Sequence, residues 1–185
     1  RDKRLRELYL QGKSGTAEYV RIQQAFIADR NEKKLPHLSQ VIRSLQTIIP
    51  FARGSGIAIA LENRNRYQDL PLPDEMETFL QLCNEPWFGF QYDAGHAHNL
   101  EVLGMVGRGE WLRRFHHRLI GIHLHDVNGL QDHLAPGMGE VDFSTLAPYL
   151  VDGVLRTLEV SPDCTTDQIA RGLEILVDHG CVKKV

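Results

Sequence analysis

The sequence has few cysteines and no long apolar run, and each shortage excludes a class of protein. Its three cysteines, Cys83, Cys164 and Cys181, are odd in number and form no C-x-x-C pair. They therefore argue against a disulfide scaffold and favour a reducing, cytoplasmic compartment. No stretch approaches the roughly 20 apolar residues that a membrane-spanning helix needs. We accordingly expect no membrane partner, and no signal-peptide pattern is visible.

The chain also lacks an excess of positive charge. Its 21 lysines and arginines are outnumbered by 24 aspartates and glutamates, so the formal net charge is -3. Such a chain has no global basic field to attract nucleic acid, and we expect no nucleic-acid partner. At 185 residues, with 42% hydrophobic and 24% charged residues, it is typical of one globular domain with a core.

Helical and extended patterns alternate along the chain. Residues 1–53 have a helical, polar pattern that ends at Pro50 and the Gly54–Gly56 turn. Beyond them the pattern predicts strands and helices in alternation: strands over 57–62, 88–93, 119–126 and 154–160, and helices over 74–84, 109–118, 142–151 and 166–179, the last ended by Gly180. This alternation indicates βαβ units and a parallel sheet. The loop over 128–141 is long and rich in glycine, which is typical of functional loops.

Each expected strand carries a side chain that can bind a metal ion near its end. These residues are Glu62, Asp93, His123 and Glu159. Alternate residues of a strand face opposite sides of a sheet, and all four fall on the smaller or more polar side of their strands. In a parallel barrel the carboxyl ends of the strands meet on one face, where active sites lie. We therefore expect the four side chains to converge inside a barrel.

The donor types indicate which ion such a site would take. Three carboxylates and one imidazole suit a single divalent ion, namely Mn²⁺, Co²⁺, Mg²⁺ or Zn²⁺. The absence of thiolates argues against a structural zinc site. A single strand-end carboxylate is more often a helix cap or a salt-bridge partner. Four such residues on the inward side of four successive strands favour the metal site instead.

Five short motifs follow one another in the order of a known family. They are Leu61–Asn63, Tyr92–His98, Ile122–Asp126, Asp132–Phe143 and Leu158–Val160. In this order and spacing, the chain over about residues 40–180 resembles the xylose isomerase-like barrel superfamily. That superfamily includes sugar isomerases and epimerases, inosose dehydratases and endonuclease IV. The resemblance implies an α/β fold of the (β/α) TIM-barrel type.

The resemblance also implies roles for individual residues. Glu62, Asp93, His123 and Glu159 would bind the metal, and Glu62 and Glu159 would also be catalytic. His96 would face the substrate or a second metal, and His133 would close over the site. His125, like His98, would lie behind the ligands or in the core, and Asp126 would orient a ligand histidine. The stretch that begins at Arg64 departs from the ketose-isomerising pattern, so Arg64 would bind a carboxylate or phosphate of the substrate.

These roles predict a metal-dependent isomerase or epimerase of a sugar or polyol. The metal would hold an enediolate, and two carboxylates would move the proton. The small-molecule partner would be that sugar or polyol. Three alternatives stay open: a polyol dehydratase of the same superfamily, an endonuclease IV-like phosphodiesterase, and a non-catalytic sugar-binding half barrel.

Four βα units make only half of an eight-stranded barrel. We expect residues 1–185 to form a single, partial barrel domain, its C-terminal half preceded by a helical segment. A half barrel alone would expose two strand edges and a large apolar face. Either the N-terminal strands are missing from this sequence, or two chains complete each other as a homo-oligomer.

Overall fold

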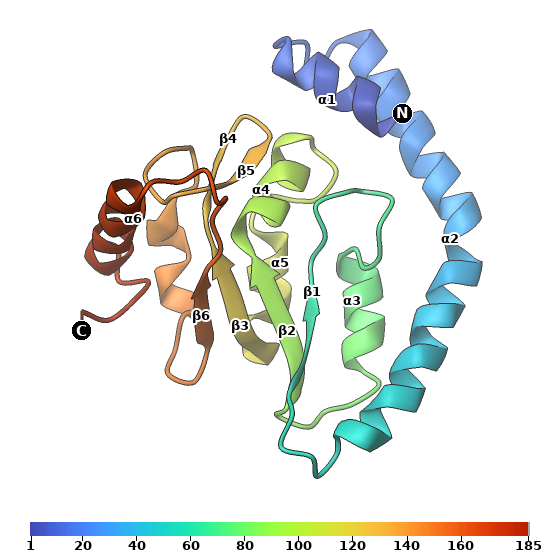
Figure 1. The fold of residues 1–185 in the computed structure, drawn as a ribbon. Coiled ribbons are helices and arrows are strands. Elements are labelled where there is room, and N and C mark those ends of the chain that lie inside the picture. Colours follow the sequence, from blue (N-terminus) through green and yellow to red (C-terminus); the bar gives the residue numbers. More distant parts are fainter. Residues whose placement is uncertain (185) are drawn as a thin grey trace.

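A layer of parallel strands organises the molecule (Figure 1). The computed structural model describes residues 1–184. Its main sheet has the order β1-β2-β3-β6, with all neighbours parallel. The strands are β1 (Ile59–Glu62), β2 (Phe88–Asp93), β3 (Leu119–Leu124) and β6 (Leu155–Leu158). A separate antiparallel hairpin joins β4 (Asp126–Asn128) to β5 (Gln131–Leu134). The α/β class and the parallel sheet are thereby confirmed.

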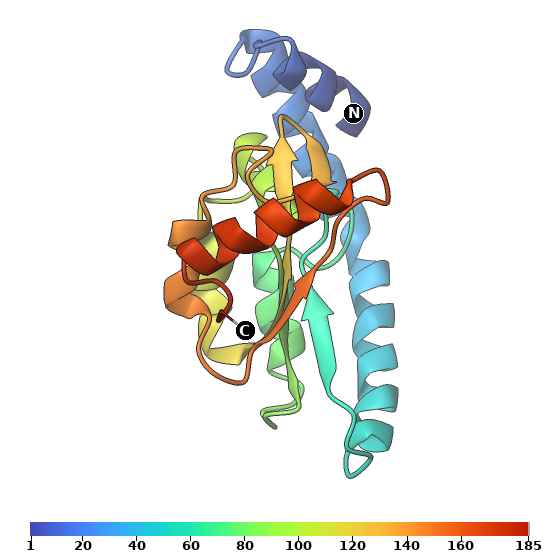
Figure 2. The same ribbon diagram turned by 60° about the vertical axis from the view of Figure 1, so that its left-hand side comes forward.

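Six α-helices surround this sheet, of which α3, α4 and α5 pack against its strands. The helices are α1 (Asp2–Leu10), α2 (Ala17–Ala52), α3 (Pro73–Leu80), α4 (Ala94–Val102), α5 (Glu110–Phe115) and α6 (Thr166–Asp178). The long helix α2 runs outside α3, and α1 lies at the end to which the strand arrows point (Figure 1). Figure 2 shows α6 lying across the direction of the strands. The helical pattern of the first 53 residues is confirmed, although Thr16 starts a second helix by accepting a hydrogen bond from the Tyr19 N–H.

Two expected elements differ in the structure. The expected helix over 142–151 is wrong, because this stretch forms two 3₁₀ turns, Phe143–Thr145 and Ala147–Tyr149. Pro148 lacks an N–H for an α-helical hydrogen bond, and the Asp142 side chain accepts the N–H of Ser144. Conversely, α4 was not expected. It begins directly after β2, where the Asp93 carboxylate accepts the N–H of His96 at 2.8 Å.

The hydrophobic core lies between the sheet and its helices. Phe90 stacks on Trp111 with 5.8 Å between ring centroids, and Ile122 is completely buried. The opposite, inner face carries small or polar residues, and at Gly121 an added Cβ would overlap the Gln91 side chain. The sequence pattern assigned Ile120 to the helix-covered face. A register shift between β2 and β3 instead places its side chain beside Gly89, on the inner face.

The remaining expectations concern membranes and cysteines. Over residues 1–184, none of the helices combines the length and the apolar character needed to span a bilayer. All three cysteines are free; Cys83 and Cys181 are buried, and Cys164 is half-buried. Burial raises the pKa of the Cys181 thiol to about 11, which makes it an unreactive packing residue.

Candidate metal centre

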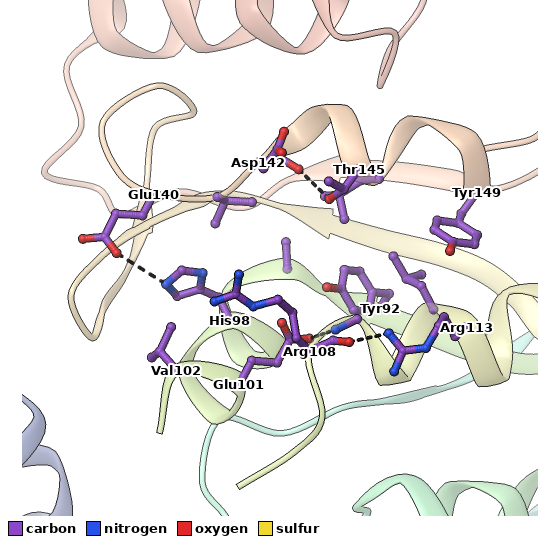
Figure 3. Close-up of a pocket in the computed structure, with 15 residues that line it drawn as sticks. Tyr92, His98, Glu101, Val102, Arg108, Arg113, Glu140, Asp142, Thr145 and Tyr149 are labelled. Carbon is purple, nitrogen blue, oxygen red and sulfur yellow. Dashed lines mark hydrogen bonds and ion pairs between the residues drawn. The ribbon is translucent and has the colours of Figure 1, made fainter. Parts of the chain in front are cut away.

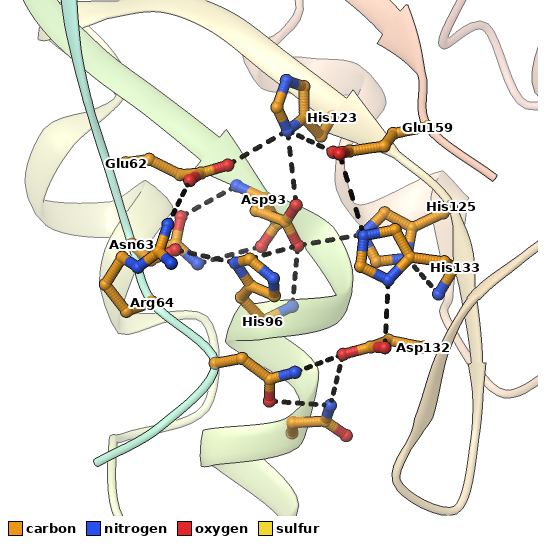
Figure 4. A network of polar contacts seen from close by, with 12 residues as sticks. Glu62, Asn63, Arg64, Asp93, His96, His123, His125, Asp132, His133 and Glu159 are labelled. Carbon is orange, nitrogen blue, oxygen red and sulfur yellow. Dashed lines mark hydrogen bonds and ion pairs between the residues drawn. The ribbon is translucent and has the colours of Figure 1, made fainter. Parts of the chain in front are cut away.

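Four side chains converge at the carboxyl ends of the parallel strands (Figure 4). Glu62 and Asp93 are the last residues of β1 and β2, and His123 lies opposite Asp93 in the parallel register. Glu159 follows β6, where its N–H donates to the Leu124 carbonyl at 3.2 Å. Parallel pairing of four neighbouring strands therefore places these residues on one end of the sheet, as the sequence pattern predicted.

The atoms of this quartet surround a common point. The Nδ1 of His123 lies 3.0 Å from Glu62 Oε1, 3.4 Å from Asp93 Oδ2 and 2.5 Å from Glu159 Oε2. One imidazole nitrogen carries at most one proton, so it cannot donate to three carboxylates at once. His123 Nδ1 and Asp93 Oδ2 are both buried without a well-formed hydrogen bond within residues 1–184. A cation between these two atoms would satisfy both, because a neutral imidazole nitrogen and a carboxylate oxygen each offer a lone pair.

A divalent metal ion fits this donor set. One ligand atom from each residue lies within 4.8 Å of all the others, and the three carboxylates concentrate negative charge. Burial alone would raise the pKa of Asp93, but the adjacent His123 imidazole and the hydrogen bond from His125 outweigh it and hold that pKa well below its usual range. Asp93 is therefore ionised at neutral pH and available to a cation.

His125 fixes the orientation of Asp93. Its Nε2 lies 2.9 Å from Asp93 Oδ1, and its Nδ1 accepts the backbone N–H of His133 at 2.8 Å. Both ring nitrogens are thus engaged, with the proton on Nε2. A second group of potential ligands combines Asp93 and Glu159 with His125 and His133, but it would need a nitrogen that His125 has already committed. The geometry therefore favours the quartet that contains His123.

His96 and His133 line the side of the quartet. The Nδ1 of His96 lies 3.0 Å from the Asn63 carbonyl, which leaves its Nε2 as an acceptor. The His133 ring stacks on His125 at 4.3 Å, and its Nε2 lies 3.8 Å from Glu159 Oε1. His133 has a φ of 61°, the only positive value among the described non-glycine residues. Such strain is concentrated at functional sites.

Asp126 anchors the loop that follows β5, the strand that carries His133. Its carboxylate accepts the N–H groups of Val127, Gly137 and Gly139 at 2.8 Å each and that of Val141 at 3.0 Å. Both oxygens of Asp126 are therefore occupied by backbone donors, and its orienting of a ligand histidine stays a prediction.

Replacing Asp126 with alanine is expected to release this loop. Three N–H groups of residues 137, 139 and 141 would lose their acceptor, at a cost of about 1–3 kcal/mol for unsatisfied groups. Amide hydrogen exchange by NMR should show lost protection at these positions, while β2 stays protected. Asp178→Ala, at an exposed helix end, is the matched control. Unchanged protection of the loop in Asp126→Ala would contradict the anchoring role.

Sequence reasoning missed several residues that support the site. The completely buried Asn63 side chain pairs with the Asp93 backbone, donating to its carbonyl at 2.9 Å and accepting its N–H at 2.8 Å. This amide extends the β1–β2 pairing by one residue and fixes Asp93. Its position directly after Glu62 in the first motif was the available signal. The side chain of Arg64 turns back to Glu62, with 2.8 Å between Nη1 and Oε2.

A polar chain connects the first helix to the site. Arg6 of α1 donates to the Asn65 carbonyl at 2.7 Å. The Asn65 side chain donates to Asp132, which also receives the Asn99 amide at 3.1 Å. Asp132 in turn lies 3.0 Å from His133 Nδ1. These partners lie up to 67 residues apart in the sequence, so no local pattern could reveal them.

A separate cavity lies on the outer side of the sheet (Figure 3). It measures about 630 Å³ and lies behind Tyr92, between α4, α5 and the 3₁₀ turns. Tyr92 and Asp93 point to opposite faces of β2, so this cavity is distinct from the metal centre. His98 belongs here, 3.9 Å from Glu140 Oε2, and burial lowers its pKa. His98 therefore does not contribute to the quartet.

Comparisons with known proteins agree with this architecture. Residues 15–178 match the family model of the xylose isomerase-like TIM barrel. A solved D-tagatose 3-epimerase-like protein is 24% identical with a TM-score of 0.55, over 77% of this chain and 54% of that one. The TTHB071 protein from Thermus thermophilus, soaked with ZnCl₂, is 24% identical with a TM-score of 0.59, over 83% and 57% respectively. None of the curated proteins matches. The chain thus spans little more than half the length of these solved structures.

Proposed function

Because the chain belongs to the xylose isomerase-like TIM-barrel family, we propose that it is a metal-dependent isomerase or epimerase of a sugar or polyol. The convergence of Glu62, Asp93, His123 and Glu159 on one point carries this proposal. We assign these four residues as ligands of one divalent ion, Mn²⁺, Co²⁺, Mg²⁺ or Zn²⁺. When bound, the ion supplies a Lewis acid that polarises a substrate oxygen.

The two glutamates are suited to moving a proton. They approach His123 Nδ1 from separate strands, at 3.0 Å for Glu62 and 2.5 Å for Glu159. One would remove a proton from a substrate carbon, and the other would return it to the neighbouring carbon or to the opposite face. Their surroundings differ, because Arg64 pairs with Glu62 at 2.8 Å, whereas the Nε2 of His133 lies 3.8 Å from Glu159.

The neighbouring histidines would position the substrate. The free Nε2 of His96 can accept a hydrogen bond from a hydroxyl group, and the Nε2 of His133, on β5, lies 3.8 Å from Glu159. We propose that both bind substrate hydroxyls and that His125 only holds Asp93. The half-exposed guanidinium of Arg64 would bind an acidic group of the substrate.

The open inner face of the sheet supports a role within a larger barrel. Ala60 and Leu155 lie in the two edge strands, β1 and β6, and both are exposed. We propose that residues 1–185 form one part of a TIM-barrel domain whose remaining strands cover this face. They would come from the same gene product or from a second copy of the chain.

A polyol dehydratase is the second candidate. The imidazoles of His96 and His133 lie beside the carboxylates, with 6.0 Å between their ring centroids. An imidazole in that place can protonate a departing hydroxyl group, which an isomerase does not require. The product distinguishes the two reactions, since a dehydratase releases water and an isomerase retains the substrate mass.

Metal binding tests the proposal directly. The chain is expected to bind one divalent ion and to gain about 2.7 kcal/mol of stability at a metal concentration 100 times Kd. Binding should weaken as the pH falls, because the ion requires neutral His123. The adjacent Asp93 carboxylate, together with Glu159 and Glu62, raises the pKa of His123 despite opposing burial, so competition by protons begins at a higher pH than for an ordinary histidine.

The measurement combines elemental analysis with deuterium exchange. Metal-loaded chain is incubated with ketoses in D₂O, and mass spectrometry follows deuterium at carbon. His123→Ala should lose both metal and exchange, whereas His117→Ala, at an exposed position, should keep both. Two results would contradict the proposal: a wild-type chain that holds no stoichiometric metal, or deuterium exchange that continues after a chelator has removed the metal.

A further inference from the structure

The outer cavity behind Tyr92 contains buried polar atoms that lack hydrogen-bond partners (Figure 3). Tyr92 is only 6% exposed, and its hydroxyl group forms no hydrogen bond within residues 1–184. The Nε2 of His98 is also buried without a hydrogen bond, 3.9 Å from Glu140. Buried polar groups of native proteins are normally paired. A cavity of about 630 Å³ with two unpaired groups in its lining therefore fits a small-molecule ligand.

Two arginines supply positive charge on one side of this cavity. Arg108 precedes α5 and Arg113 lies on it, both side chains are exposed, and neither forms an ion pair in the described part of the chain. The Nη1 of Arg113 donates only to the Arg108 carbonyl. Glu101 lines the same side, and its carboxylate accepts the Gly109 N–H at 2.9 Å. This side thus has two guanidinium groups and one carboxylate, a formal charge of two minus one, or +1.

Acidic side chains line the opposite side. Figure 3 shows Asp142 across the cavity from Arg108 and Arg113. The Oδ1 of Asp142 accepts the Ser144 N–H at 3.1 Å, whereas its Oδ2 accepts no hydrogen bond from residues 1–184. Glu140 adds a second, exposed carboxylate to this side. Charges of opposite sign are therefore held apart across the cavity and do not pair with one another.

Apolar side chains complete the lining of the cavity; they are Val102, Leu112 and Leu146. Leu112 and Leu146 are buried. Mostly apolar walls with a few placed polar groups are typical of small-molecule sites. The middle of a bound molecule would accordingly be apolar, and its charged groups would lie at its ends.

We propose that this cavity binds a zwitterion, a small molecule with a carboxylate at one end and an ammonium group at the other. The carboxylate would accept charge-assisted hydrogen bonds from Arg108 and Arg113 and a hydrogen bond from the Tyr92 hydroxyl. The ammonium group would lie between Asp142 and Glu140. This site is on the face of β2 opposite to the metal centre, so the inference does not depend on the proposed reaction.

Calorimetric titration with straight-chain amino acids tests this site. The probes are γ-aminobutyrate and ε-aminocaproate, each compared with the acid that lacks its amine and the amine that lacks its acid. Metal is first removed with a chelator, so that a carboxylate cannot bind an ion at the quartet. At least one zwitterion should bind about fivefold or more tightly than both of its matched compounds, because only the zwitterion meets both sides of the cavity.

Two variants test the two ends separately. Arg108→Gln should weaken binding of the zwitterion and the acid by about fivefold and leave binding of the amine unchanged. Asp142→Asn keeps the acceptor for Ser144 and should weaken binding of the zwitterion and the amine but not of the acid. Both variants change exposed side chains, so the fold should persist. The control Arg43→Gln removes an exposed charge of α2 outside the cavity and should bind like the wild type.

Two results would overturn the inference. One is a wild-type chain that binds no zwitterion more tightly than its matched acid and amine. The other is zwitterion binding that is the same in the control and in the two cavity variants.

Discussion

Glu159→Gln is expected to abolish proton exchange at the substrate carbon, with a loss of about 10²–10⁴-fold, the usual contribution of a general base. Glutamine has nearly the same shape, but its amide cannot accept and return the proton. Glu159 is suited to this role because it is 42% exposed at the mouth of the site, whereas Asp93 is completely buried behind it. Deuterium incorporation measures the rate, and elemental analysis measures the metal in the same samples.

The control separates catalysis from a general effect of losing a carboxylate. Glu174→Gln, on the exposed surface of α6, should exchange at the wild-type rate. Wild-type exchange in Glu159→Gln would remove this residue from the mechanism. If metal and exchange disappear together, Glu159 is a ligand only, and Glu62 becomes the remaining candidate for the base.

Glu75→Gln is expected to lower the free energy of unfolding by about 3–5 kcal/mol, as breaking a buried ion pair does. Both oxygens of Glu75 receive the Arg30 guanidinium, at 2.6 and 2.7 Å, and Oε2 also accepts the Leu72 N–H at 2.8 Å. Both side chains are 3–4% exposed. The amide would leave the guanidinium charge buried without its counter-ion. Urea unfolding followed by circular dichroism measures the loss.

Two further variants test this explanation. Glu77 lies on α3 like Glu75, and Glu77→Gln breaks its surface pair with Arg114 of α5, which should cost less than about 1 kcal/mol. Arg30→Met with Glu75→Met should recover much of the loss, because the double change removes both buried charges and leaves only Lys34, which is 28% exposed, without its partner. A Glu75→Gln chain as stable as the wild type would show that the Arg30–Glu75 pair makes no net contribution to the free energy of unfolding.

The same pair predicts a pH dependence. Burial raises the pKa of Glu75, but the Arg30 hydrogen bonds and the Leu72 N–H outweigh it, so the folded pKa is lowered. A lowered pKa stabilises the fold above the unfolded carboxyl pKa of about 4.3. This stabilisation is lost as the pH falls through the lower, folded value. The wild type should therefore lose more stability in acid than the double methionine variant.

The strands and the quartet were readable from the sequence because their signals are local. Two-residue alternation set the inward side of each strand, and the expected strand over 88–93 has the bounds found in the structure. The alternation failed at Ile120, since a bulge depends on the neighbouring strand. The helix expected over 142–151 failed because Pro148 and the Asp142 side chain favoured 3₁₀ turns. The metal-binding role of the quartet stays a prediction that elemental analysis tests.

The hydrogen bonds and ion pairs around the quartet join residues that are distant in the sequence, so no local sequence pattern encodes them. By itself the sequence determined a parallel α/β sheet, its family resemblance, and four side chains directed to one end. Only the tertiary structure decided that His125 holds Asp93, that Asp126 anchors a loop, and that Arg108 and Asp142 line one cavity. The physical reason is that strand periodicity is set by neighbouring residues, whereas hydrogen bonds and charge clusters join residues separated by tens of positions.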